Sequence, residues 1–228
     1  SLLGQRTSTP SLAIALGLTL FLAASPVMQL RAADSPTAEK DKAQELLELF
    51  QGEGNVTNSL DAVMVWIPAG YRVAKTEVTQ ARYQEVVGRN PSKFKGPSRP
   101  VEQVSPAEAK AFCRQLTERE HEAGTLPKSF AYGLPSEQEF DNYVANTPLD
   151  TAFVSLIGDR VETIAVASLP PNPLGLHDVR GNVWEWCQGA VARGASYQSH
   201  EDYLAPSFRF VGNPDMRTPI AHALAWPD

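Results

Sequence analysis

This sequence lacks the features that usually mark a nucleic-acid-binding protein. It has no run of lysine or arginine, and its formal net charge is −6. Clustered cations are what neutralise phosphate groups, so nucleic acid is not an expected partner. No internal repeat is apparent, and 43% of the 228 residues are apolar. This composition predicts one globular domain with a sizeable core.

Cysteine is also rare, since the chain contains only Cys113 and Cys187. In an exported protein these two residues could form one disulfide. Two buried free thiols are the alternative, because cysteine often behaves as a small apolar core residue. The sequence does not choose between the two interpretations.

The N-terminal apolar run is too short for an ordinary membrane span. It covers residues 12–24, "LAIALGLTLFLAA", whereas a spanning helix needs about 20 apolar residues. Arg6 precedes it, and small residues followed by "RAADS" come after it. This order is typical of a secretory signal. We therefore expect residues 1–32 to be a signal peptide, or alternatively a membrane anchor formed by residues 12–28. Either predicts export, to the periplasm, the cell surface or the medium.

Residues 33–62 are mostly polar and are expected to form a linker, with a possible short helix at "KAQELLELF". A first strand is expected at "VMVWIPAG", residues 63–70. Three helix starts follow, at Thr79, Ser105 and Ser136. The last two are capping boxes, in which a serine is followed three residues later by a glutamate.

The part of the chain from residue 146 onward has no sustained helical or strand periodicity. Proline, glycine and asparagine interrupt it throughout. We expect a loop-rich half, and tryptophan burial and bound metal are the usual means of holding such loops. "GLHDVRGNVWEWC", residues 175–187, contains two of the four tryptophans.

Six motifs occur in a fixed order along the chain. They are "KTEVTQARY", "NPSKFKGPSRPVEQVS", "AKAFCRQL", "YGLPSEQEFDNY", "PPNPLGLHDVRGNVWEWC" and "VARGASY". In this order they resemble the formylglycine-generating enzyme (sulfatase-modifying factor) family. The resemblance runs from about residue 64 to 209. It implies an α+β fold, a variant of the C-type lectin fold with two main helices, small twisted antiparallel sheets and many loops.

The resemblance sets the expected domain at residues 63–212. Relatives usually end near a "GFR" strand that closes the sheet against the first strand. The segment "RFVGNPDMRTPIAHALAWPD" offers no clear equivalent. Residues 213–228 are therefore expected to be a divergent C-terminal tail.

The resemblance also implies a structural calcium ion. Family members wrap it with two side-chain oxygens and two carbonyl oxygens, a donor set that suits calcium. The corresponding residues are Asp178, Gly181, Val183 and Glu185. The alternative is that Asp178 and Glu185 form ordinary ion pairs with Arg180 or Arg193. Trp186 is expected to be a core aromatic, and Trp184 to line the family's cleft.

Copper chemistry is not expected. Members that make formylglycine hold Cu(I) between two cysteines, because soft thiolates select that ion. Those two positions correspond to Ser199 and Leu204, and Cys187 is the only nearby thiol. Another branch of the superfamily uses nonheme iron bound by a separate His-rich domain. Here no two histidines are three or four residues apart, so that chemistry is not expected either.

These observations predict an exported, non-catalytic binding or structural module that recognises a protein, peptide or glycan. The expected binding residues are Trp184, Ser196, Tyr197, Ser199, His200 and Tyr203. One alternative is an enzyme with a different, non-copper chemistry, for which Ser196, Ser199 and His200 are the candidate participants. Another is an accessory subunit of a cell-envelope or membrane complex, held by an uncleaved N-terminal helix.

Overall fold

The computed structural model describes residues 36–144, 146–149, 152, 162–205, 207–212 and 224–227. The chain divides into two units, residues 1–39 and 40–228. The expected signal peptide or anchor lies outside the described residues. Within the described ranges, no helix is both long and apolar enough to cross a membrane.

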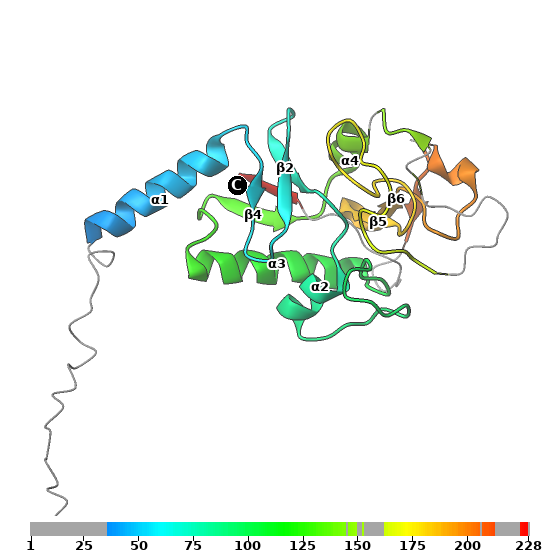
Figure 1. Ribbon diagram of the computed structural model, residues 1–228, viewed down its shortest axis with the longest axis horizontal. Coiled ribbons are helices and arrows are strands. Elements are labelled where there is room, and N and C mark those ends of the chain that lie inside the picture. Colours follow the sequence, from blue (N-terminus) through cyan, green and yellow to red (C-terminus); the bar gives the residue numbers. More distant parts are fainter. Residues whose placement is uncertain are drawn as a thin grey trace, which may run out of the picture. The chain divides into compact units, whose positions relative to one another are not determined.

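The larger of two sheets has five antiparallel strands, formed mainly by the first half of the chain (Figure 1). Strand β2 contains the run expected at residues 63–70, and Gly70, with φ of +99°, allows the tight turn into β3. In spatial order the strands are β1 (Val56–Thr57), β2 (Val63–Ile67), β3 (Tyr71–Ala74), β8 (Leu224–Pro227) and β4 (Phe130–Gly133).

Strand β8 corrects the expectation that residues 213–228 form a divergent tail with no closing strand. It pairs with β3 through Arg72 and Ala225, and with β4 through Tyr132 and Ala225. A C-terminal strand is therefore present, and it lies between β3 and β4 and not against the first strand. Its sequence, "LAWP", is too short to show a strand period and contains a proline, so only its pairing with distant strands identifies it.

Four α-helices are described: α1 (Pro36–Gln51), α2 (Gln80–Val87), α3 (Pro106–Ala123) and α4 (Glu137–Val144). The expected helix starts are confirmed. Thr79 caps α2, and the capping boxes form between Ser105 and Glu108 and between Ser136 and Glu139. Helix α1 is longer than the short helix expected within residues 33–62, and it occupies much of what was interpreted as a polar linker.

Helix α1 ends against the large sheet through one buried arginine. The Arg72 guanidinium donates to the carbonyl oxygens of Phe50 at 2.7 Å, Gly52 at 2.6 Å, Gly54 at 2.9 Å and Leu49 at 3.2 Å. These are carbonyls of the last turn of α1 and of the segment that follows it, which have no helical donors of their own. The Arg72 side chain therefore serves as the C-terminal cap of α1.

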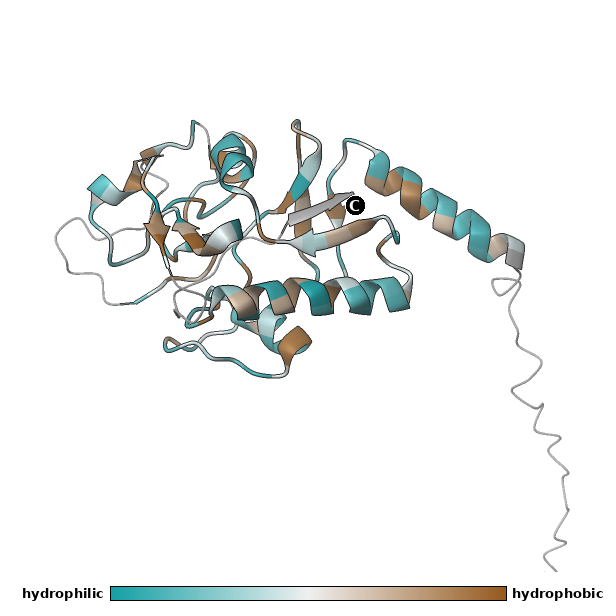
Figure 2. Cartoon of the chain, turned by 180° about the vertical axis from the view of Figure 1, so that it is seen from behind, coloured by the Kyte–Doolittle hydropathy of each residue, from teal (hydrophilic) through white to brown (hydrophobic). Residues whose placement is uncertain are grey.

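The core consists of two main clusters. The first lies between α3 and the five-stranded sheet and includes Cys113 and Trp186, whose indole N–H donates to Val104 O at 2.9 Å. The second surrounds Tyr143 and includes Cys187. Both thiols are buried and free. The structure therefore agrees with the interpretation of two free thiols and not with a disulfide. Helix α3 alternates apolar and polar residues, as one-sided burial requires (Figure 2).

The second half of the chain forms a small antiparallel sheet with a long, irregular approach to it. Its strands are β5 (Glu185–Cys187), β6 (Val191–Arg193) and β7 (Phe210–Val211), in that spatial order. Strand β5 is the "EWC" of the "GNVWEWC" motif. The small sheet therefore contains Glu185, one of the expected calcium ligands, and begins directly after Trp184.

Candidate functional site

The turn that leads into β5 is tightly wound. Asp178, Gly181 and Asn182 all have positive φ, of 59°, 84° and 52°. Glycine adopts this region without steric cost, and asparagine and aspartate are the next most tolerant residues. The Gly181 N–H donates to Gly194 O at 2.7 Å, which ties the turn to the residue after β6.

Asn182 connects this turn to three distant segments. Its side-chain oxygen accepts from Ile164 N at 3.0 Å, and its amide group donates to Glu77 Oε2 at 2.7 Å. Its backbone oxygen accepts from Tyr197 N at 2.8 Å. The turn expected to bind calcium is therefore connected by hydrogen bonds to the segment expected to form the cleft.

Three carboxyl groups lie buried around the turn. Glu77 is 0% exposed, Glu185 1% and Asp178 3%. Tyr143 donates its hydroxyl to Glu185 Oε2 at 2.9 Å, and Ala167 N donates to Asp178 Oδ2 at 2.7 Å. The other oxygen of Asp178, Oδ1, is buried and has no hydrogen-bond partner. A buried acceptor without a donor is costly, so each such atom calls for an explanation.

Burial also shifts the pKa of each of these carboxyl groups upward. The pKa of Glu77 is raised well above its ordinary value by desolvation, and further by the charges of Asp178 and Glu185. Desolvation raises the pKa of Glu185 well above its ordinary value too, although the Tyr143 hydrogen bond opposes the shift. The pKa of Asp178 rises for the same reason. Charged carboxylates at these positions repel one another in a poorly solvated region.

The residues fit a hard cation that takes mixed oxygen ligands. Asp178 Oδ1 is an unused buried acceptor, and calcium prefers carboxylates combined with backbone carbonyls. Among the described residues, no group of three or more His, Cys, Asp or Glu side chains is arranged to hold a metal. A cation here would therefore depend on carbonyl oxygens of the turn. The alternative ion pairs are not formed by Asp178: Arg180 donates to Leu204 O, and Arg193 pairs with Glu137 and Asp141.

The raised pKa values predict how pH affects the metal-free protein. When a carboxyl group has a higher pKa in the folded protein than in the unfolded chain, its protonation stabilises the folded state. This stabilisation is complete below the unfolded-state pKa and is lost as the pH rises through the folded-state pKa. The ordinary values are 4.5 for glutamate and 3.8 for aspartate. We expect the gain in melting temperature on adding calcium, relative to chelator at the same pH, to grow from about pH 4.5 upward, because the cation offsets the carboxylate charges. A gain that is constant with pH would contradict this.

A group of four aromatic side chains, two exposed and two half-buried, lies at the small sheet. We call Trp184, Tyr203, Phe208 and Phe210 the aromatic patch. The Trp184 ring lies 5.7 Å from Phe208 and 6.3 Å from Phe210, and Tyr203 lies 4.6 Å from Phe208, measured between ring centroids. Tyr203 is 43% exposed and Phe210 39%. Phe208 and Phe210 were missed by the sequence analysis, although the alternation in "SFRF" is typical of a strand and could have indicated them.

Three other expected cleft residues are buried instead. Ser196 N donates to Ser199 Oγ at 2.9 Å, and the two hydroxyl oxygens are 3.2 Å apart. Tyr197 packs edge-to-face against Phe94, with ring centroids 5.6 Å apart. The structure thus brings Trp184 and Tyr203 together and places Ser196, Tyr197 and Ser199 in the interior.

His200 is exposed and faces its own loop. Its Nδ1 lies 3.1 Å from Asp202 Oδ2 and caps the short helix that follows. Within the described contacts, His200 forms no hydrogen bond with Ser196 or Ser199. A serine nucleophile needs a base within hydrogen-bond reach, so this arrangement does not favour the expected alternative of a serine–histidine enzyme.

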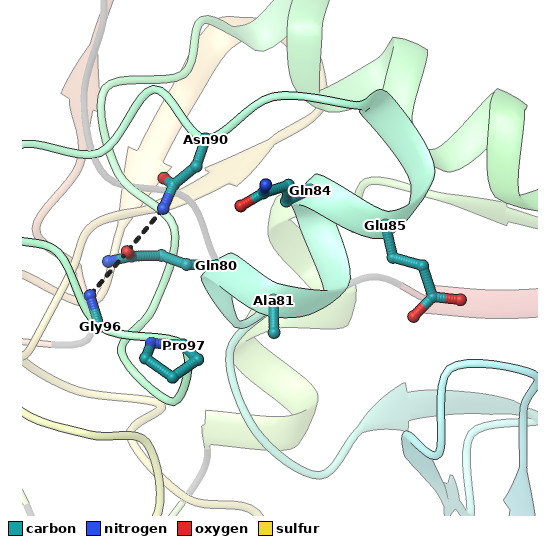
Figure 3. Close-up of a pocket in the computed structure, with 7 residues that line it drawn as sticks. All are labelled: Gln80, Ala81, Gln84, Glu85, Asn90, Gly96 and Pro97. Carbon is teal, nitrogen blue, oxygen red and sulfur yellow. Dashed lines mark hydrogen bonds between the residues drawn. The ribbon is translucent and has the colours of Figure 1, made fainter.

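A hollow of about 590 Å³ lies beside α2 (Figure 3). Gln80 holds the loop on one side of it: Asn90 Nδ2 and Gly96 N both donate to Gln80 Oε1, at 2.9 and 3.0 Å. The exposed Glu85 pairs with Arg119. The buried amide of Gln80 is therefore used to hold the loop.

Comparisons with known proteins agree with the arrangement of the fold. A family profile described as "Sulfatase-modifying factor enzyme 1-like domain" matches residues 31–220. Treponema denticola variable protein 1 superposes with a TM-score of 0.60 and 24% identity, over 69% of this chain and 84% of that one. PvdO from Pseudomonas aeruginosa superposes with a TM-score of 0.58 and 17% identity, over 69% and 80%. At these identities the likeness shows the fold alone.

A curated relative is the chaperone protein LppX of Paenibacillus barcinonensis. It is 28% identical over 171 residues, which cover 51% of this chain and 61% of the relative. The chain therefore spans less than two thirds of that relative's length. A serine/threonine-protein kinase, pkn1 of Chlamydia pneumoniae, is 63% identical over only 27 residues, 4% of its length. That match covers too little of the kinase to carry its activity.

Proposed function

Because the chain belongs to the sulfatase-modifying factor enzyme 1-like family, we propose that it is an exported, non-catalytic member that binds a protein, peptide or glycan partner. The observation that carries this proposal is the aromatic patch beside the small sheet. An accessory role in a cell-envelope complex is one form that such binding would take.

The patch has the chemistry of a recognition surface. Aromatic side chains bury a large area on binding, and tyrosine and tryptophan can still form hydrogen bonds at the rim. Such residues dominate the affinity of protein interfaces. Tyr203 and Phe210 are among the five exposed large apolar residues of the described chain, and they belong to one contiguous group through Phe208 and Trp184.

The two positions that correspond to the copper thiols of formylglycine-generating members support binding rather than oxidation. Leu204 is buried and packs with Ala195 and the partly buried Trp184. An apolar side chain thus supports the tryptophan of the patch at a position where the formylglycine-generating members have a thiol. Ser199 is used in a hydrogen bond to Ser196. The name of the LppX relative, a chaperone, agrees with a binding role.

A structural calcium ion is part of the same proposal. The carboxylates of Asp178 and Glu185 and the carbonyl oxygens of Gly181 and Val183 would hold it. When bound, the ion would supply positive charge to a group of buried carboxylates and so stabilise the turn before β5. Its role is to keep the loops that support the patch in place.

Tyr203→Ala tests the binding proposal. Tyr203 is 43% exposed, so its loss should change the melting temperature little. If it is a binding hot spot, its loss should weaken association by about 2 kcal/mol, or roughly thirty-fold. Peptide and glycan arrays would be probed with the full chain, and the dissociation constant of each hit would be measured for the wild type and the variant.

Leu49→Ala is the matched control, since Leu49 is an exposed apolar residue on α1, 52% exposed. It should keep wild-type affinity for the same hits. Unfolding of Tyr203→Ala, or wild-type affinity of this variant for every hit, would show that the patch is not the binding surface.

A further inference from the structure

Glu77 is a buried acid of the "KTEVTQARY" motif that the expected calcium ligands do not include. It lies between β3 and α2, and its side chain is completely buried. Both of its oxygens accept hydrogen bonds from the turn before β5. Oε2 accepts from Asn182 Nδ2 at 2.7 Å, and Oε1 accepts from Val183 N at 3.2 Å. One carboxylate thus holds two successive residues of the turn.

These contacts hold one particular peptide unit, the one between Asn182 and Val183. Its N–H donates to Glu77, and its carbonyl oxygen accepts from Tyr197 N at 2.8 Å. This unit lies between the two carbonyl groups, of Gly181 and Val183, that the proposed calcium site uses. Because peptide units are planar and share Cα atoms, fixing the central unit restricts the orientation of both neighbouring carbonyls.

The proposed calcium site would need the orientation of these carbonyl groups to be restricted. The described side chains are not sufficient to hold a metal by themselves, so its affinity would depend on where the turn carbonyls point. Asp178 Oδ1 is buried with no hydrogen-bond partner, which marks the acceptor that a cation would use. Groups that orient metal ligands typically contribute 10-fold to 100-fold to metal affinity.

We propose that Glu77 is a positioning residue for calcium: it orients the Gly181 and Val183 carbonyls by holding Asn182 and Val183. This inference rests on the calcium site of the proposed function. It extends that site to a residue about a hundred positions earlier in the chain, between β3 and α2.

Glu77→Gln tests the inference by replacing one of the two acceptor oxygens with an amide group while keeping the shape of the side chain. Metal-stripped full-length protein would be titrated with calcium chloride by calorimetry. We expect the affinity of Glu77→Gln for calcium to fall at least about tenfold below the wild type. Thermal melts with calcium and with chelator would measure the stability gain independently of the calorimetric signal.

Glu120→Gln is the matched control. Glu120 is also completely buried, and it accepts hydrogen bonds from Ser59 and from the Tyr132 hydroxyl at 2.7 Å. Its loss should destabilise the fold and leave calcium affinity within about twofold of the wild type, because it does not contact the turn. A loss of affinity in Glu120→Gln as large as in Glu77→Gln would overturn the positioning role.

Asn182→Gly provides a second route if Glu77→Gln does not fold. It removes the amide that bonds to Glu77, and glycine accepts a φ of 52° without strain. It should also weaken calcium binding. Wild-type affinity in either folded variant would overturn the inference and leave the calcium site standing. Absence of calcium binding by the wild type would overturn the site itself, and the inference with it.

Discussion

Replacing Arg72 with methionine is expected to destabilise the protein by about 3 to 5 kcal/mol. Each buried hydrogen bond from a charged group contributes about 1.5 to 3 kcal/mol, and the total loss is smaller than their sum because some of the carbonyl groups that lose their donor will bind water instead. The guanidinium donates to four carbonyl oxygens at the end of α1. Methionine keeps much of the apolar contact with Phe50 and Trp66, whose rings lie 5.5 and 5.1 Å from the guanidinium carbon. The change therefore removes mainly the donors.

Replacing Arg72 should also have a local effect on helix α1. Without its cap, the last turn of α1 should separate from the sheet, and limited proteolysis should cut between residues 36 and 54. Arg82→Met is the matched control, since Arg82 is a half-buried arginine that donates to Leu60 O and Asp61 O. It should cost less and leave α1 protected. Equal costs in denaturant unfolding, with α1 intact in both variants, would show that Arg72 is not the cap.

Arg193→Met is expected to have the second largest effect, about 3 kcal/mol, which is the low end for breaking a buried ion pair. Arg193 is 3% exposed, lies 2.6 Å from Asp141 and 3.2 Å from Glu137, and covers the Phe140 ring at 4.8 Å. The two acids of α4 are partly exposed, so water will compensate for part of the loss. Chemical denaturation would measure the change.

The same variant should weaken ligand binding, because Arg193 Nε donates to Phe208 O at 3.1 Å. Phe208 is the ring that joins Trp184 to Tyr203 in the aromatic patch. Asp141→Asn is the control: it alters one partly exposed pair, and it should cost less than about 1 kcal/mol and leave affinity unchanged. If Arg193→Met bound array hits as tightly as the wild type, the proposed support of the patch would be wrong.

The sequence by itself determined the elements whose causes lie within a few residues. The Ser105–Glu108 and Ser136–Glu139 boxes predicted the starts of α3 and α4, since a cap needs only its own first turn. The ordered motifs predicted the family and its loop-rich α+β fold. The resemblance implied that Asp178 and Glu185 are calcium ligands, and only the structure shows that both side chains are buried. Whether these residues bind calcium stays a prediction.

Only the tertiary structure decided which distant residues meet. Glu77 contacts Asn182 across 105 positions, and the Arg72 guanidinium reaches carbonyls about 20 positions earlier. Strand β8 is recognisable only from its pairing with β3 and β4. Tyr203 proved exposed and Tyr197 buried, although both are tyrosines of one loop segment. No local pattern encodes these outcomes, because they depend on how the two sheets and their connecting loops fill space together.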